Sequence, residues 1–320
     1  MKNILEVINK YNSFVLAGHT SPDGDAIGSC CALALALNDM GKQARVILEP
    51  FAQKYHIIPG REFFVTPNQA EALQPEVFIA LDCAAAKRLC ETARKVFERT
   101  EVTICIDHHD TNKGFAMHNY IDSSASSTAE MVFNIVYEIS ELTQDIATAI
   151  YAGMISDTGG FKYNATAKST MLKASRLMEI IPFTNIYNEL MHKHRFSAGK
   201  ALGLALEKSE RTKNKKIVFT YMTNEMLESV KASHADLDGI VEYLMTTRNA
   251  LVAIFVYEKK GEQGKAKVSL RSHGPDVGRV ASALGGGGHV LAAGATVDGT
   301  VDEILRLALK LVKKEVEKFS

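Results

Sequence analysis

Residues 14–25 read Phe-Val-Leu-Ala-Gly-His-Thr-Ser-Pro-Asp-Gly-Asp, and the expected fold follows from them. The apolar run at 14–17 is typical of a short buried strand. An almost wholly apolar helical pattern follows at 26–40, and Gly41 is placed to end that helix. A buried strand that leads through a short turn into an apolar helix is typical of a parallel sheet covered by helices.

The same alternation continues through the first half of the chain. Further strands are predicted at 45–48, 77–81 and 102–106, a helix-like stretch at 84–98, and two helices within 127–155. Together these segments predict an α/β fold with a doubly wound, mainly parallel sheet that has helices on both faces.

The second half of the chain predicts a smaller α/β domain. Strand-like runs lie at 217–222, 251–257 and 266–270, and the last two are the expected arms of a hairpin that turns near Gly261. A helix with apolar positions at helical spacing is expected at 301–319.

Three parts are therefore expected along the chain: a first domain over 1–185, a helical linker over 186–209 and a second domain over 210–320. Near the start of the second domain a basic cluster is typical of an exposed turn. It consists of Arg211, Lys213, Lys215 and Lys216, with Asn214 inside it.

Composition excludes several classes of protein. Of 320 residues 46% are hydrophobic and 23% charged, which are ordinary values for a globular protein. The 37 basic and 37 acidic side chains give a net charge of zero. Proteins that coat long DNA or RNA are usually basic, because phosphate neutralisation drives their affinity. A short nucleotide in a locally basic pocket remains compatible with this charge balance.

The compartment is predicted from the cysteines and the N-terminus. The five cysteines have no C-x-x-C spacing and are typical of reduced, buried thiols in the cytosol. Charged residues within 1–10 interrupt any signal-peptide core, and the most apolar stretch, 26–37, is shorter than the ~20 residues of a membrane span. We expect a soluble, cytoplasmic protein with no membrane partner.

Aspartate and histidine follow the ends of the predicted strands and one helix. Because parallel strands present their carboxyl ends at one edge of a sheet, four separate segments deliver these side chains to the same place. The residues concerned are His19, Asp23, Asp25, Asp82, Asp107, His108, His109 and Asp157.

This set predicts a metal centre. Carboxylates alone would suit magnesium or calcium, whereas several histidines with several carboxylates suit manganese, iron, cobalt or zinc. Six or more such side chains exceed the needs of one catalytic metal and fit two ions that share a bridging carboxylate. Two divalent ions ~3.5–4 Å apart can polarise a phosphoryl group, generate a hydroxide nucleophile and stabilise the leaving oxygen.

Each motif has a simpler interpretation when it is taken alone. Residues 23–25 are compatible with a turn and helix cap, 108–109 with a polar strand end, and 157–159 with a turn. Their coincidence at strand and helix ends favours the metal interpretation.

The series His19-x-x-x-Asp23-x-Asp25, Asp82, Asp107-His108-His109 and Asp157 resembles the motifs of the DHH phosphoesterase family. The resemblance implies two manganese ions that support hydrolysis of phosphoanhydrides or phosphodiesters. It implies that His19 and Asp23 hold one ion, that Asp25, His108 and Asp157 hold the other, and that Asp82 bridges them. It also implies that His109 lies beside the substrate phosphate and that Asp107 orients a ligand histidine.

A second pair of motifs lies in the C-terminal half. Four glycines, 285–288, precede His289 and let backbone N–H groups approach an anion or a base edge. A flexible linker is the alternative, which the apolar residues on both sides disfavour. Arg271, followed by Ser272 at a predicted strand end, suits bidentate phosphate binding, although a surface salt bridge is the alternative for Arg271 alone.

Together these motifs resemble the DHH-associated substrate domain of the oligoribonuclease (nanoRNase) and 3′-phosphoadenosine-5′-phosphate (pAp) phosphatase subgroup. The resemblance implies a substrate-binding domain across a cleft from the catalytic domain, with Arg271, Ser272, Gly286, Gly287, Gly288 and His289 holding the nucleotide. It implies hydrolysis of short 5′-phosphorylated oligoribonucleotides to 5′-mononucleotides and of pAp to AMP.

Other functions stay open. They are a linear or cyclic dinucleotide phosphodiesterase, an inorganic pyrophosphatase or polyphosphatase, and a non-catalytic nucleotide sensor. Only Arg271 and Arg279 lie near the glycines, which disfavours a pyrophosphatase, and the complete ligand set disfavours a sensor. The oligomeric state is open, with a homodimer as one option.

Overall fold

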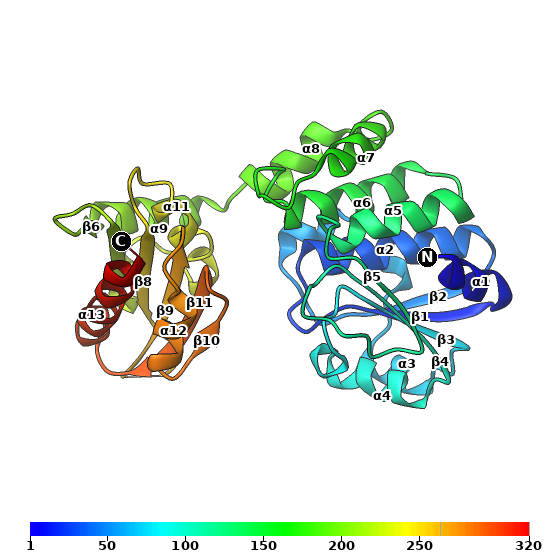
Figure 1. The fold of residues 1–320 in the computed structure, drawn as a ribbon, viewed down its shortest axis with the longest axis horizontal. Helices are drawn as coiled ribbons and strands as arrows, with labels where there is room; N and C mark the ends of the chain where they lie inside the picture. The colour runs from blue at the N-terminus through cyan, green and yellow to red at the C-terminus, as the bar shows by residue number, and fades with distance from the viewer. Residues whose placement is uncertain (263, 320) are drawn as a thin grey trace. The chain divides into compact units, whose positions relative to one another are not determined.

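The structure is a computed structural model that describes residues 1–262 and 264–319. The chain forms two compact units, Met1–Lys193 and His194–Ser320, each with its own hydrophobic core (Figure 1). Of the segment 186–209, for which we expected a helical linker, residues 186–193 belong to the first unit and the remainder to the second.

The first unit is built on a five-stranded sheet in which all neighbouring strands are parallel, in the order β2-β1-β3-β4-β5. Its strands are β1 (Ser13–Ala17), β2 (Gln43–Ile47), β3 (Val77–Leu81), β4 (Val102–Asp107) and β5 (His118–Ile121). The predicted α/β class with a doubly wound parallel sheet is confirmed. The sequence did not predict β5, an edge strand whose residues are largely exposed or half-buried and carry no apolar run.

Helices cover both faces of this sheet (Figure 1). Phe14 and Leu16 pack on the side of α2, α5 and α6, whereas Val15 and Ala17 pack on the side of α3 and α4. The helices of the unit are α1 (Lys2–Lys10), α2 (Gly24–Asp39), α3 (Pro67–Ala72), α4 (Glu91–Arg99), α5 (Thr128–Ile139), α6 (Gln144–Asp157), α7 (Lys168–Met178) and α8 (Phe183–Tyr187). The central strand β3 is apolar and buried along its whole length, as expected for a parallel sheet that is covered on both faces.

One predicted helix is shorter than expected. The stretch 84–98 is α-helical only from Glu91, because a separate 3₁₀ turn, Ala86–Arg88, precedes it. This irregular segment also places Leu89 in a bridge with His19, next to the end of β1.

The second unit holds a six-stranded mixed sheet in the order β10-β11-β9-β8-β7-β6. Among the described strands of this second sheet, only β7 and β8 pair in parallel, and β8–β9 is the predicted hairpin. Its strands are β6 (Glu210–Arg211), β7 (Ile217–Met222), β8 (Val252–Glu258), β9 (Lys265–Ser272), β10 (Gly287–Gly288) and β11 (Ala292–Asp298). The smaller α/β domain is thereby confirmed.

Alternating residues of β8 face two layers of helices. Ile254 and Val256 pack with α12 and α13, whereas Ala253 and Phe255 pack with α9, α10 and α11. These helices are α9 (Phe196–Glu207), α10 (Asn224–Ser229), α11 (Ile240–Leu244), α12 (Val277–Ala283) and α13 (Val301–Phe319). Among the helices of residues 1–262 and 264–319, none is both long and apolar enough to cross a bilayer.

Candidate metal centre

The metal-type residues gather where the strand order of the first sheet reverses. β1 and β3 are neighbours in space, and their connections run to opposite sides of the sheet. His19 follows the carboxyl end of β1, and Asp82 directly follows β3. A point of this kind is where ligands bind in open parallel sheets, because the loops diverge there and leave a crevice.

Two glycines bring the start of α2 and the end of α6 to this edge. A Cβ atom on Gly28 would lie 2.5 Å from the carbonyl oxygen of Ala149, and one on Gly153 would lie 2.5 Å from Cβ of Ala129. Glycine at both positions therefore permits the close approach of the helices. As a result Asp25, in the first turn of α2, and Asp157, the last residue of α6, belong to one cluster.

Asp82 lies at the centre of the cluster. Its Oδ2 is 3.6 Å from Nε2 of His19, and its Oδ1 is 3.6 Å from Nε2 of His108. The two oxygens thus face two different histidines. Three sets of residues could each hold a metal ion, because the potential ligand atoms within each set lie within 4.8 Å of one another. The sets are His19, Asp23 and Asp82; Asp25, His108 and Asp157; and Asp82, His108 and His109.

The backbone of Asp82 adopts a left-handed conformation, with φ of 53°. Such a conformation is uncommon for a residue with a side chain and often marks a functional site. The N–H of Asp82 donates to the carbonyl of Ile106 at 3.0 Å, and the hydroxyl of Thr128 donates to Asp82 Oδ1 at 3.1 Å. The carboxylate is 2% exposed and is held in one orientation.

Asp25 is held by the N-terminus of α5. The backbone N–H groups of Thr128 and Ala129 donate to its two carboxylate oxygens at 2.7 and 2.8 Å. The hydroxyl of Ser29 also donates to it, at 3.3 Å. A helix N-terminus favours negative charge, so α5 stabilises and orients a fully buried carboxylate.

Hydrogen bonds fix which ring nitrogen each of two histidines presents. The Thr20 carbonyl accepts a hydrogen bond from Nδ1 of His19 at 2.8 Å, which leaves Nε2 free to bind a metal. His109 donates from Nδ1 to Asp107 Oδ1 at 2.7 Å. We expected Asp107 to orient a ligand histidine, and the histidine that it contacts is His109.

The charges of the cluster point to a cation. Burial together with the charges of Asp23 and Asp157 raises the pKa of Asp82 to about 6. Burial opposes protonation of His108, but its hydrogen bond with Asp157 and the nearby carboxylates raise its pKa to about 10. The pKa of His19 rises to about 9 in the same way, against burial and through the neighbouring Asp23. Crowded, buried carboxylates with imidazole donors are a set that fits divalent metal ions.

In the second unit the expected nucleotide-binding residues meet at one end of the sheet. Arg271 pairs across the ladder with Ala292 of β11, and Gly288 of β10 pairs with Ala293. The N–H of Ser272, at the end of β9, donates to the carbonyl of Leu291 at 2.9 Å. Arg271, Ser272, Gly286, Gly287, Gly288 and His289 therefore belong to one local structure.

The glycines of this local structure differ in the space that surrounds them. A Cβ atom on Gly286 would overlap the carbonyl of Gly294, and one on Gly288 would lie 2.5 Å from Cα of Ala293. Both are therefore required by packing against β11. Gly287 has no neighbour within 4 Å of such a Cβ among the described residues, so its open face is the one that stays accessible to a ligand.

Comparison with known proteins identifies the family. The DHH family N-terminal domain matches residues 13–154, and the DHHA1 domain matches residues 200–318. The bifunctional oligoribonuclease and PAP phosphatase NrnA of Thermus thermophilus is 30% identical over 99% of this chain and 94% of its own length. The chain belongs to the DHH family.

Further DHH relatives agree over nearly the full length. The bifunctional oligoribonuclease and PAP phosphatase NrnA of Bacillus subtilis is 25% identical, over 92% of both chains. The crystal structure of an exopolyphosphatase-related protein from Bacteroides fragilis is 26% identical, with a TM-score of 0.89, and covers 98% of this chain and 95% of that one. The predicted membership of the DHH phosphoesterases is confirmed.

The structure of this DHH protein shows residues that hold the candidate site residues in place and that the sequence did not reveal. Asn112 donates from Nδ2 to Asp107 Oδ2 at 2.7 Å and to the Cys83 carbonyl at 3.2 Å. It therefore positions the Asp107 carboxylate, which in turn positions His109. Its place five residues after Asp107 is the only signal in the sequence. Thr128 was missed because its bond to Asp82 joins segments 46 residues apart.

Glu242 of the DHHA1 domain is a further residue of this kind. Its Oε1 accepts from a terminal nitrogen of Arg271 at 2.7 Å, and the other terminal nitrogen donates to the Leu270 carbonyl at 3.0 Å. The salt bridge that was the alternative for Arg271 is thus present. It holds the guanidinium in one place while the side chain stays 35% exposed.

Proposed function

We propose that this chain is a metal-dependent phosphoesterase that hydrolyses short 5′-phosphorylated oligoribonucleotides to 5′-mononucleotides and converts pAp to AMP. The observation that carries the proposal is the central position of Asp82, whose two oxygens face His19 and His108 separately. The names of the full-length relatives support this substrate class.

Two ions are proposed to share the cluster. His19 and Asp23 would hold one, Asp25, His108 and Asp157 the other, with Asp82 between them. Two of the three sets support this division, because the ligand atoms of His19, Asp23 and Asp82 lie within 4.8 Å of one another, as do those of Asp25, His108 and Asp157. The mixture of imidazole and carboxylate donors suits manganese, iron, cobalt or zinc, and we propose Mn²⁺ from the resemblance to the DHH phosphoesterases. When bound, such ions supply Lewis-acid activation of water and of the phosphoryl oxygen.

We propose that His109 acts on the substrate phosphate and that Asp107 orients its ring. Because Nδ1 of His109 is bonded to Asp107, Nε2 is the nitrogen available to the phosphate. The His109 side chain is 42% exposed, in contrast to the buried acid behind it, so a substrate can reach the ring. The Asn112 amide donates a hydrogen bond to Asp107 and so keeps this carboxylate in position behind His109.

The second unit is proposed to bind the nucleotide. Arg271 and Ser272 would hold a phosphate, and Gly287 with its neighbours Gly286, Gly288 and His289 would let the backbone approach the ligand closely. Zero net charge supports a substrate of a few nucleotides rather than long RNA. We place the reaction in the cytoplasm, since the five cysteines, all within the described residues, form no disulfide.

The test is a substrate panel on the full chain after chelation, with and without added Mn²⁺. We expect fast cleavage of a 5′-phosphorylated RNA dinucleotide and of pAp, slow cleavage of a long RNA, and activity only with added metal. The His108→Ala variant should be inactive, whereas His56→Ala, which changes an exposed histidine of the same unit, should match the wild type. A preference for pyrophosphate, or activity that needs no metal, would contradict the proposal.

A further inference from the structure

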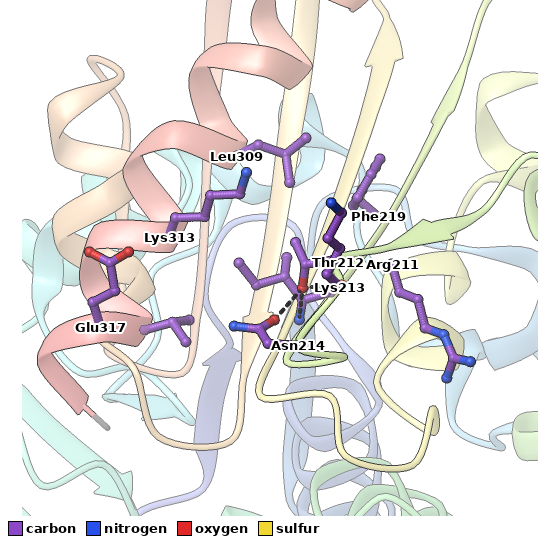
Figure 2. Close-up of a pocket in the computed structure, with 10 residues that line it drawn as sticks. Arg211, Thr212, Lys213, Asn214, Phe219, Leu309, Lys313 and Glu317 are labelled. Atoms are coloured by element: carbon purple, nitrogen blue, oxygen red, sulfur yellow. Dashed lines mark hydrogen bonds between the residues drawn. The ribbon is translucent and has the colours of Figure 1, made fainter.

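A cavity of about 490 Å³ lies in the second unit, between the β6–β7 turn and the C-terminal half of α13 (Figure 2). Its volume is within the usual range of small-molecule sites. It is separate from the glycine-rich structure, because β6 and β10 form opposite edges of the six-stranded sheet. The basic turn that the sequence showed at 211–216 forms one wall, and none of its residues has a place in the proposed reaction.

The turn is a fixed structure. Asn214 Oδ1 accepts a hydrogen bond from the Thr212 hydroxyl at 2.7 Å and from the N–H of Lys216 at 3.2 Å. The N–H of Thr212 donates to the Ile217 carbonyl at 3.0 Å, which closes the hairpin. The Asn214 amide nitrogen makes no hydrogen bond within residues 1–262 and 264–319, so it remains a donor at the edge of the cavity.

Two lysines supply positive charge at one end of the cavity. Lys213 comes from the turn and Lys313 from α13, and neither forms an ion pair in the part of the chain that the structure describes. In Figure 2 both side chains extend toward the end marked by Leu309 and Phe219. The Glu317 carboxylate also lines the cavity, at the side opposite Phe219 (Figure 2), and forms no ion pair with either lysine among the described residues.

The same end has an apolar wall. Phe219 of β7 and Leu309 of α13 are both half-buried and pack against the core of the unit. Their exposed parts form an apolar surface beside the two ammonium groups (Figure 2). A ligand that fits has an anionic group and a flat apolar body, a combination that an inorganic phosphate lacks and a nucleotide has.

We propose that this cavity, the β6–α13 pocket, is an accessory binding site for a nucleoside 5′-monophosphate. The phosphate lies between Lys213 and Lys313, and the base lies against Phe219 and Leu309. The proposal rests on the pocket and does not require the proposed hydrolysis to be correct.

The test is calorimetric titration of AMP into the full-length, metal-free protein that carries Arg271→Ala, which weakens the other nucleotide site. AMP should still bind this protein. Adding Lys213→Ala and Lys313→Ala should weaken that binding at least tenfold, whereas adding Lys314→Ala, a change of an exposed lysine on the same helix outside the pocket, should leave it unchanged. Adenosine and ribose 5-phosphate should each bind at least tenfold more weakly than AMP.

Absence of AMP binding in the Arg271→Ala protein would overturn the proposal, as would equal binding with and without the two pocket lysines. If ribose 5-phosphate binds as tightly as AMP, the base adds nothing to the affinity, and this result would overturn the proposal as well. In an otherwise unchanged chain, the two lysine substitutions should leave hydrolysis of the RNA dinucleotide within twofold of the wild type, so failure of the pocket and failure of the proposed function are distinguishable.

Discussion

In the first unit the candidate site consists mainly of buried charged side chains, whereas in the second it consists of accessible backbone and one half-buried cation. Asp25, Asp82 and Asp107 are 0%, 2% and 0% exposed. Arg271, by contrast, is 35% exposed and Gly287 faces open space. Burying several carboxylates together is costly unless other groups compensate them, so such a cluster points strongly to a ligand. A half-buried arginine that is already paired with Glu242 carries no such cost, so its position beside glycines points less strongly to a ligand.

The two regions are also oriented by different means. Around the metal-type cluster, groups from distant segments fix each side chain, as the N-terminus of α5 fixes Asp25. In the second unit the ladder between β9, β10 and β11 fixes the backbone, and Glu242 together with the neighbouring Leu270 carbonyl restrains Arg271. Substitutions in the first unit should therefore affect turnover, and those in the second should affect affinity.

The largest effect is expected for Asp82→Asn. An amide has one acceptor oxygen and no charge, so it cannot replace a carboxylate that faces two histidines. Turnover should fall by more than the ~10–100-fold typical of residues that only support a metal ligand. Steady-state kinetics with Mn²⁺ measures this, and Asp110→Asn, an exposed aspartate beside the same motif, is the control. Near-normal turnover would remove Asp82 from the centre of the site.

Asn112→Ala tests whether the groups behind the site act on turnover. Loss of its bond to Asp107 leaves that carboxylate, and hence the His109 ring, less well oriented. We expect kcat to fall by about 10–100-fold with little change in KM. Asn119→Ala, which changes an exposed asparagine of the neighbouring segment, should behave as the wild type. A rise in KM at unchanged kcat would instead place Asn112 in substrate binding.

Arg271→Ala tests the separation between the two units. Losing a hydrogen bond to a charged group costs about 1.5–3 kcal/mol, so KM for the RNA dinucleotide should rise at least tenfold. Any hydrolysis of pyrophosphate should change little, because both of its phosphoryl groups would be held by the metal centre and none by Arg271. Arg306→Ala, an exposed arginine of α13, is the matched control. Equal loss on both substrates would contradict the division of roles.

The smallest effect on activity is expected for Glu130→Gln. This residue lies in the first turn of α5, the helix whose N-terminus holds Asp25. Burial disfavours the charge of Glu130, but hydrogen bonds from Lys173, Ser126 and Thr170 lower its pKa from 4.5 to about 2. A lowered pKa in the folded state stabilises the protein above the unfolded value of 4.5, and this contribution is lost as pH falls toward 2.

Urea denaturation at pH 7 and near pH 3 measures this contribution. The substitution should lower the free energy of unfolding by up to about 3 kcal/mol at pH 7. The difference should shrink at the lower pH, while kcat at pH 7 stays within a few-fold of the wild type. A loss of stability that is the same at both pH values would show that shape rather than charge matters at Glu130.

Strands β1–β4 and β7–β9, and the Asp and His residues at the ends of β1, β3 and β4, could be predicted from the sequence, because apolar runs and strand ends are local features. Strands β5, β6, β10 and β11 were not predicted. The residues that orient the site could not. Asn112 and Thr128 act through contacts made only after the sheet has formed, and Glu242 meets Arg271 across the second unit. Strand β10 was hidden by its composition, since two glycines carry no strand signal and pair only because β11 lies beside them.

The most direct test of the central claim is the number of Mn²⁺ ions bound per chain, measured by equilibrium dialysis and elemental analysis. The account predicts two ions for the wild type and the loss of at least one in Asp82→Asn, with the fold of both proteins unchanged by circular dichroism. One ion or none in the wild type, or two ions retained by Asp82→Asn, would contradict a centre in which Asp82 joins two metal sites.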